Sequence, residues 1–157
     1  MTAQIGSHIG PSVDRCTDDP LYTLGEIVWG KDGKAYRYVQ FKDAVTYVKG
    51  HIVCLKDVGW LVTNDVSANL AGDHPVGVVF QDTVPTENQY GFVQVAGEAT
   101  FVAGSASIVA GDWLKPDASE DGDMEEATAG TDENICAFAL ATVADNASGA
   151  CLLYNLL

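Results

Sequence analysis

The sequence predicts an all-β protein of about ten short strands, folded as a jelly-roll-like β-sandwich or a small barrel. No stretch of a dozen residues repeats its apolar positions at helical spacing, whereas short apolar or alternating runs recur throughout the chain. Successive runs are separated by roughly 8–12 residues, a spacing typical of sandwiches and barrels rather than of βαβ units. The pattern therefore favours sheets joined by short turns.

The first strands are expected around a hairpin in residues 25–41, GEIVWGKDGKAYRYVQF. Asp32-Gly33 marks its turn, because both residues accept positive φ angles. Further strands are predicted in the apolar runs at 44–48, 51–55, 59–65, 75–81, 135–143 and 150–157. Residues 90–114, YGFVQVAGEATFVAGSASIVAGDWL, lie between these runs. Glycines at 97, 104 and 111 let the chain turn there, which predicts three consecutive strands crossing the centre of the fold.

Two segments differ from the rest of the chain. Residues 1–24 hold widely spaced apolar residues and predict an extended N-terminal arm, while residues 25–157 are expected to form a single domain. Residues 115–133 are acidic and polar and predict a loop or an irregular hairpin around Asp121-Gly122. Weak similarity between about 25–97 and 98–157 suggests an internal duplication. The alternative is that two unrelated all-β halves share the same pattern of strands and turns.

The charge balance limits the partners. The 157 residues include 22 acidic and 8 basic ones, giving a net charge of -14, so binding to nucleic acid is not expected. No secretory signal is visible, and no run approaches the roughly 18 apolar residues of a membrane helix. We therefore expect synthesis in the cytoplasm and no membrane partner.

The residues of catalytic sites are sparse. Three histidines, His8, His51 and His74, are available as general bases, and no serine lies in a Gly-x-Ser-x-Gly setting. The alternative of an enzyme would be supported if a measurable turnover were lost on mutation of a histidine or carboxylate. The residues to mutate are His51, His74, Asp112 and Glu98. The sequence predicts no enzyme, no cofactor and no transition-metal site, since His-x-His and His-Glu-x-x-His are absent.

Three other groups of residues are candidate sites. The run from Asp117 to Thr128 approaches a calcium loop, but Thr128 stands where the bidentate Glu belongs, so a solvated acidic loop is the preferred interpretation. The cysteines are scattered without metal-ligand spacing, and three of them are expected to be buried apolar side chains: Cys54, Cys136 and Cys151. The tryptophans form a sugar-binding platform only if they share a face, and core positions are preferred: Trp29, Trp60 and Trp113.

The order of these motifs resembles the head decoration (cement) proteins of tailed bacteriophages. The resemblance rests on LGEIVWGKDGKAYRYVQF, then HPVGVVFQDTVPTENQYGFVQVAGEATF, then GDWLKPDASEDGDMEEATAG, then NICAFALATVADNASGACLLYNLL. It spans Gly25 to Leu157, and none of its motifs is catalytic. The resemblance implies a structural virion protein on the capsid exterior that binds the major capsid protein, often as a homotrimer, and holds neighbouring capsomers together.

The first 24 residues lie outside the resemblance, and their apolar residues are the predicted capsid or subunit contacts: Ile5, Ile9, Val13 and Leu21. A sparse apolar arm of this kind can become ordered on a partner. The alternative function is a receptor- or carbohydrate-binding β domain of a virion fibre, which is favoured if Trp29, Trp60 and Tyr90 lie exposed on one face.

Overall fold

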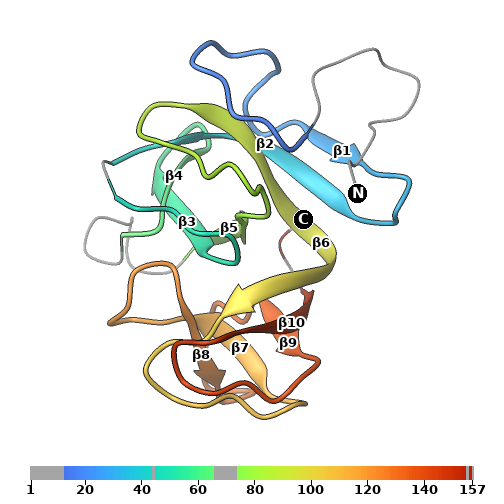
Figure 1. Ribbon diagram of the computed structural model, residues 1–157, viewed down its shortest axis with the longest axis vertical. Helices are drawn as coiled ribbons and strands as arrows, with labels where there is room; N and C mark the ends of the chain where they lie inside the picture. Colours follow the sequence, from blue (N-terminus) through green and yellow to red (C-terminus); the bar gives the residue numbers. More distant parts are fainter. Residues whose placement is uncertain (1–12, 44, 66–73, 155, 157) are drawn as a thin grey trace.

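The computed structural model describes residues 13–43, 45–65, 74–154 and 156, and in them the protein is all-β (Figure 1). The predicted fold class is confirmed, with a small barrel rather than a simple sandwich. The strands in this part of the chain are β1 (Ile27–Trp29), β2 (Ala35–Phe41), β3 (Ile52–Asp57), β4 (Leu61–Thr63), β5 (Pro75–Val78), β6 (Tyr90–Val102), β7 (Trp113–Pro116), β8 (Met124–Ala127), β9 (Ala137–Ala139) and β10 (Ser148–Leu153). No helix among the described residues is long and apolar enough to cross a membrane.

Five strands close into a barrel in the N-terminal half of the chain. They are hydrogen-bonded in the order β2-β4-β3-β5-β6, and β6 pairs again with β2. Closure removes the free edges that an open sheet of these strands would expose. Val39, Val53, Val62 and Val93 lie in the core with no exposed surface. We call this unit the N-terminal barrel.

Strands β7, β8, β9 and β10, with the second half of β6, form a second unit below the barrel in Figure 1, whereas β1 extends the barrel beside β2. The second half of β6 pairs with β10, and β9, β7 and β8 follow in that order. Ala103, directly after β6, bridges Met124 at the start of β8, so this C-terminal sheet curls back toward its first strand. Phe101, Ile108 and Leu114 fill its interior with no exposed surface.

Strand β6 belongs to both units. Its residues up to Ala96 pair with β2, whereas Gly97 to Val102 pair with β10. Gly97 has a φ of 87°, in the region that favours glycine, and the register of β2 and β6 shifts beside it. The buried Gln94 side chain donates to the carbonyls of Ala96 and Glu98, at 3.1 and 2.8 Å, and so fixes both sides of the bend.

This arrangement corrects the interpretation of residues 90–114 as three strands. Gly97 bends β6 without ending it, so the first two predicted strands are one. Residues 107–112 are largely irregular, and β7 begins only at Trp113. The strand predicted at 44–48 is also wrong: residues 45–48 are irregular, and Tyr47 is buried because its ring packs on Phe41.

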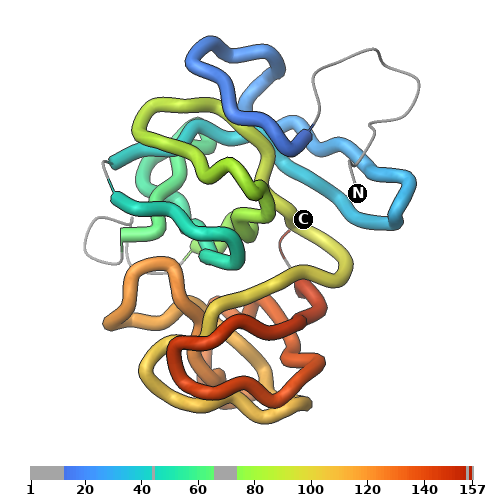
Figure 2. Tube along the Cα trace, in the orientation of Figure 1, coloured from blue at the N-terminus to red at the C-terminus, as the bar shows by residue number. Residues whose placement is uncertain are grey.

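Residues 13–24 lie against the outside of the barrel (Figure 2). Thr17 and Tyr90 exchange two backbone hydrogen bonds of 2.8 Å. The Tyr22 ring meets the rings of Tyr38 and Phe92 edge-on, each at 5.2 Å between centroids, and Val13 is fully buried in the same cluster. This part of the predicted arm therefore covers an aromatic face of its own domain.

Two further contacts hold the units together. The Ile52 amide of the barrel donates to the Gly122 carbonyl, in the turn between β7 and β8, at 2.7 Å. Arg37, 8% exposed, donates to the Leu156 carbonyl at 3.1 Å, and its guanidinium lies 4.1 Å from the ring centre of Trp60. Burial lowers the pKa of Arg37, and these contacts compensate its desolvation.

The bend in β6 provides a test of the shared strand. Gly97→Ala places a Cβ in the left-handed region and 3.1 Å from the side chain of Lys34. Gly33→Ala is the matched control, since Gly33 has a φ of 78° with nothing within 4 Å of such a Cβ. We expect the free energy of unfolding in urea to fall by about 1 kcal/mol for the control and by about 2–3 kcal/mol for Gly97→Ala. Equal losses would contradict a packing role for the bend.

Candidate docking surface

An uncharged apolar face lies on the outside of the C-terminal sheet. In register across neighbouring strands, Trp113 pairs with Phe138 and Phe138 with Leu152. Burial alternates along these strands, so that Leu114, Ala137 and Cys151 point into the core and their neighbours point outward. The apolar face, as we define it, consists of Trp113, Phe138, Leu140, Leu152 and Tyr154.

Three side chains of the apolar face are well exposed, the other two are partly buried, and its three rings contact one another. Leu140, Leu152 and Tyr154 are 44, 47 and 54% exposed. The Trp113 ring meets Phe138 and Tyr154 edge-on, at 5.3 and 5.5 Å between centroids. Single exposed leucines are ordinary, but a contiguous apolar set rimmed by polar residues is typical of interaction sites.

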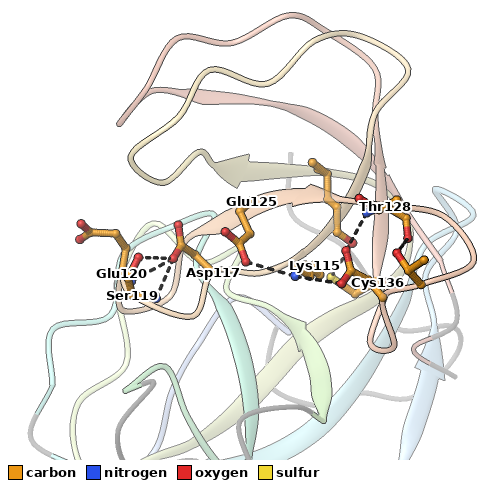
Figure 3. A network of polar contacts seen from close by, with 10 residues as sticks. Lys115, Asp117, Ser119, Glu120, Glu125, Thr128 and Cys136 are labelled. Atoms are coloured by element: carbon orange, nitrogen blue, oxygen red, sulfur yellow. Dashed lines mark hydrogen bonds and ion pairs between the residues drawn. The ribbon is translucent and has the colours of Figure 1, made fainter.

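The rim of the apolar face is acidic. Glu98 lies directly beside Leu152, on β6. On the other side, Lys115 is 3.4 Å from Glu125 and 3.3 Å from Asp132, so one cation faces two carboxylates (Figure 3). A partner with an apolar centre and basic flanks would complement this surface.

The two described histidines, His51 and His74, lie apart from this face. His51 lies at the contact between the two units: its Nδ1 is 2.9 Å from Asn64 Nδ2, and its Nε2 is 3.6 Å from Asp123 Oδ1. Burial lowers the pKa of His51, which Asp121 partly opposes. His74 precedes β5 and is exposed, and His8 lies outside the described residues. The printed distances thus place His51 between an amide and a carboxylate at the contact of the two units.

The acidic loop is a folded turn. One carboxylate oxygen of Asp117 accepts hydrogen bonds from the Ser119 amide and hydroxyl, both at 2.7 Å, and from the Glu120 amide at 3.2 Å (Figure 3). This is the turn that a capping Asp makes with its own following backbone. Over the residues that the structure describes, no cluster of three metal-ligand side chains is arranged to hold an ion.

The remaining predicted residues serve packing or local bonds. Asp112 accepts the Val109 amide at 2.8 Å, and the cysteines expected to be buried are buried, with Cys16 partly so. The three tryptophans do not share one platform, since Trp29 lies on β1, Trp60 covers Arg37 and Trp113 lies in the apolar face. Among the predicted contact residues, Ile5 and Ile9 lie outside the described residues, Val13 is buried and Leu21 is 50% exposed.

An open groove of about 660 Å³ was not anticipated from the sequence. It runs past both units and is lined by Asp32, Lys34, Gln94 and Glu98 among others. Four of the polar residues that line the groove bond to one another: the Tyr36 hydroxyl donates to Asp32 at 3.0 Å, and Lys49 forms an ion pair with Asp82 at 2.6 Å.

The apolar face was also missed, although its signal was present. Leu152 and Tyr154 alternate with Cys151 and Leu153, and a sheet with one face in a core should carry polar residues on the other. Apolar residues at both alternating positions therefore indicated a second covered surface. The pairing with Phe138 and Trp113 depends on register, which the sequence did not specify.

Comparisons with known proteins identify the fold. No family model matches the chain, and no curated protein sequence matches it. Among solved structures, the chain is similar to the N base of the head fiber protein gp8.5 in bacteriophage phi29. The match has a TM-score of 0.50 and 12% sequence identity, and it covers 76% of this chain and 94% of the other. The fold thus resembles that of a phage head-fibre base.

Asp123 provides a pH test of the contact between the units. Burial, with Glu120, Asp117 and Asp121 nearby, raises the pKa of Asp123 to about 6. The free energy of unfolding therefore falls as pH rises from about 4 to 6, because the folded chain holds the Asp123 proton more tightly than the unfolded chain, and the loss is complete above about 6. We expect Asp123→Asn to raise the free energy of unfolding by about 1 kcal/mol at pH 8 and not at pH 4.

Asp121→Asn is the matched control for this measurement. It removes a neighbouring charge at an exposed position, so its gain at pH 8 should be smaller than that of Asp123→Asn. Chemical denaturation at the two pH values provides the comparison. A loss of stability in Asp123→Asn at pH 8 would show that its contact with His51 outweighs its burial.

Proposed function

We propose that this chain is a non-enzymatic structural protein of a phage head that binds the outer surface of the assembled capsid. The observation that carries the proposal is the fold shared with the phi29 head-fibre base, of which 94% is covered. The order of motifs from Gly25 to Leu157 supports it independently, since it resembles head decoration proteins. The major capsid protein is the proposed partner, and the homotrimer is the proposed assembly.

The apolar face supports this function physically. A chain of net charge -14 needs an uncharged contact or a basic partner to bind tightly, and this face provides an apolar centre with an acidic rim. Binding to assembled shells alone stabilises them by mass action, by about 2.7 kcal/mol per site when free protein is about 100-fold above Kd. We propose that such binding cements neighbouring capsomers.

A second candidate is a receptor- or carbohydrate-binding domain of a virion fibre. The observation that favours it is the ring cluster formed by the exposed Tyr154 with the partly buried Trp113 and Phe138, since aromatic rings also stack on sugars. A glycan array separates the two candidates: saturable binding of a defined sugar that is lost in Trp113→Ala supports this one.

Co-sedimentation with capsids tests the first candidate. Capsids of the phage that encodes the chain, stripped of surface proteins, are mixed with wild type, Leu140→Ser or Leu152→Ser. We expect each serine variant to raise the Kd about tenfold, because a buried leucine contact of roughly 1–2 kcal/mol is lost.

Val58→Ser is the matched control, as Val58 is 79% exposed in the turn between β3 and β4. It should bind like wild type. Capsids that bind neither wild type nor control would contradict the function. Normal binding by both leucine variants would contradict the assigned face.

A further inference from the structure

A small cavity lies at the contact between the N-terminal barrel and the C-terminal sheet, with a volume of about 10 Å³. Residues in or next to β3 and β4 line one side of it, and residues in or next to the turn between β7 and β8 line the other. Four buried polar residues belong to this lining, none of them more than 9% exposed: Thr63, Asn64, Asp117 and Asp123. Buried polar groups are almost always hydrogen-bonded, so each of these side chains should have a partner.

Asn64, directly after β4, has only half of its amide bonded. Its Nδ2 donates to the Thr46 carbonyl at 3.1 Å and lies 2.9 Å from His51 Nδ1. Its Oδ1 is buried and accepts no hydrogen bond from the described residues, although Asn64 is only 4% exposed. An unpaired buried acceptor is costly. Because Asn64 lines the cavity, this oxygen indicates a hydrogen-bond donor inside it.

Asp123 faces the same cavity from the other unit. Its Oδ1 is 3.6 Å from His51 Nε2, which is too long for a hydrogen bond, and no donor among the described residues bonds its carboxylate. Asp117 differs, because one of its oxygens already accepts three hydrogen bonds in the acidic loop (Figure 3). Asn64 and Asp123 therefore present two unfilled acceptors, one from each unit.

Water matches this cavity in size and in chemistry. A volume of about 10 Å³ is at the lower limit for one water molecule, and it leaves no room for a larger ligand. Water has two hydrogens to donate, one for each acceptor. A metal ion matches less well, because the described residues provide no group of three acidic, histidine or cysteine ligands.

We propose that one water molecule is bound in this cavity and bridges the two units, donating one hydrogen to Asn64 Oδ1 and the other to the Asp123 carboxylate. A bridging water of this kind is nearly as favourable as a direct hydrogen bond. It joins the units beside the backbone bond from Ile52 to Gly122, and it helps to hold the C-terminal sheet, with its apolar face, against the barrel. The bridge does not depend on the proposed function.

A high-resolution crystal structure tests the bridge directly. We expect density for a single water about 2.5–3.0 Å from both Asn64 Oδ1 and a carboxylate oxygen of Asp123. A cavity without density would overturn the inference. Density surrounded by oxygens at about 2.3–2.6 Å, the distances typical of calcium, would overturn the assignment to water.

Nuclear Overhauser measurements test the same bridge in solution on the wild-type chain. Ile52 is 2% exposed and lines the cavity, whereas the neighbouring Val53 has no exposed surface and does not line it. We expect a cross-peak between the water resonance and the methyl hydrogens of Ile52, and none for Val53. Val53 is the matched control, because bulk water reaches neither side chain. A missing Ile52 cross-peak would contradict a bound water.

Two substitutions of Asn64 test which group holds the water. Asn64→Leu removes the acceptor, whereas Asn64→Asp keeps an oxygen, and both lose the contacts made by Nδ2. We expect the Ile52 cross-peak to be lost in Asn64→Leu and retained in Asn64→Asp, with circular dichroism showing that both are folded. A cross-peak that survives in Asn64→Leu would refute the role of Asn64. Should either variant unfold, the two wild-type measurements decide.

Discussion

The architecture depends on one strand that serves two sheets. β6 closes the N-terminal barrel through β2 and then begins the C-terminal sheet through β10. Without the bend at Gly97, a strand of 13 residues would carry the ladder straight past the barrel, and the C-terminal sheet would have no first strand in place. Gln94 holds the bend from inside by satisfying carbonyls on both sides of it. The positions of the apolar face and of the acidic turn follow from this single deviation.

The sequence predicts the fold class well because its signals are local. Asp32-Gly33 and Asp121-Gly122 both turn hairpins as expected, and the glycines of these pairs have φ angles of 78° and 80°. The lack of a helical repeat of apolar residues can likewise be seen in short windows of the sequence, without knowing which strands pair. The choice between sandwich and barrel is different, since it depends on the pairing of β2 with β6, far apart in the chain.

The errors have the same origin. The strand end predicted at Gly97 is wrong, because a glycine alone does not distinguish a bend within a strand from a turn. The run at 44–48 has strand composition, but Tyr47 is buried through contacts with Phe41 and the Lys42 carbonyl instead of a ladder. The change of partners at Gly97 does coincide with the boundary between the two similar halves, and duplication remains a prediction. The apolar face depends on the register of three strands, β7, β9 and β10, which no local pattern specifies.

The shared strand also has a mechanical consequence. Six residue pairs hold β6 to β2 and six hold it to β10, and the covalent backbone joins the two ladders. A force that pulls the barrel and the C-terminal sheet apart along β6 is therefore carried by peptide bonds and shears both ladders at once, instead of opening hydrogen bonds one after another. A load applied to one unit is therefore transmitted to the other through β6.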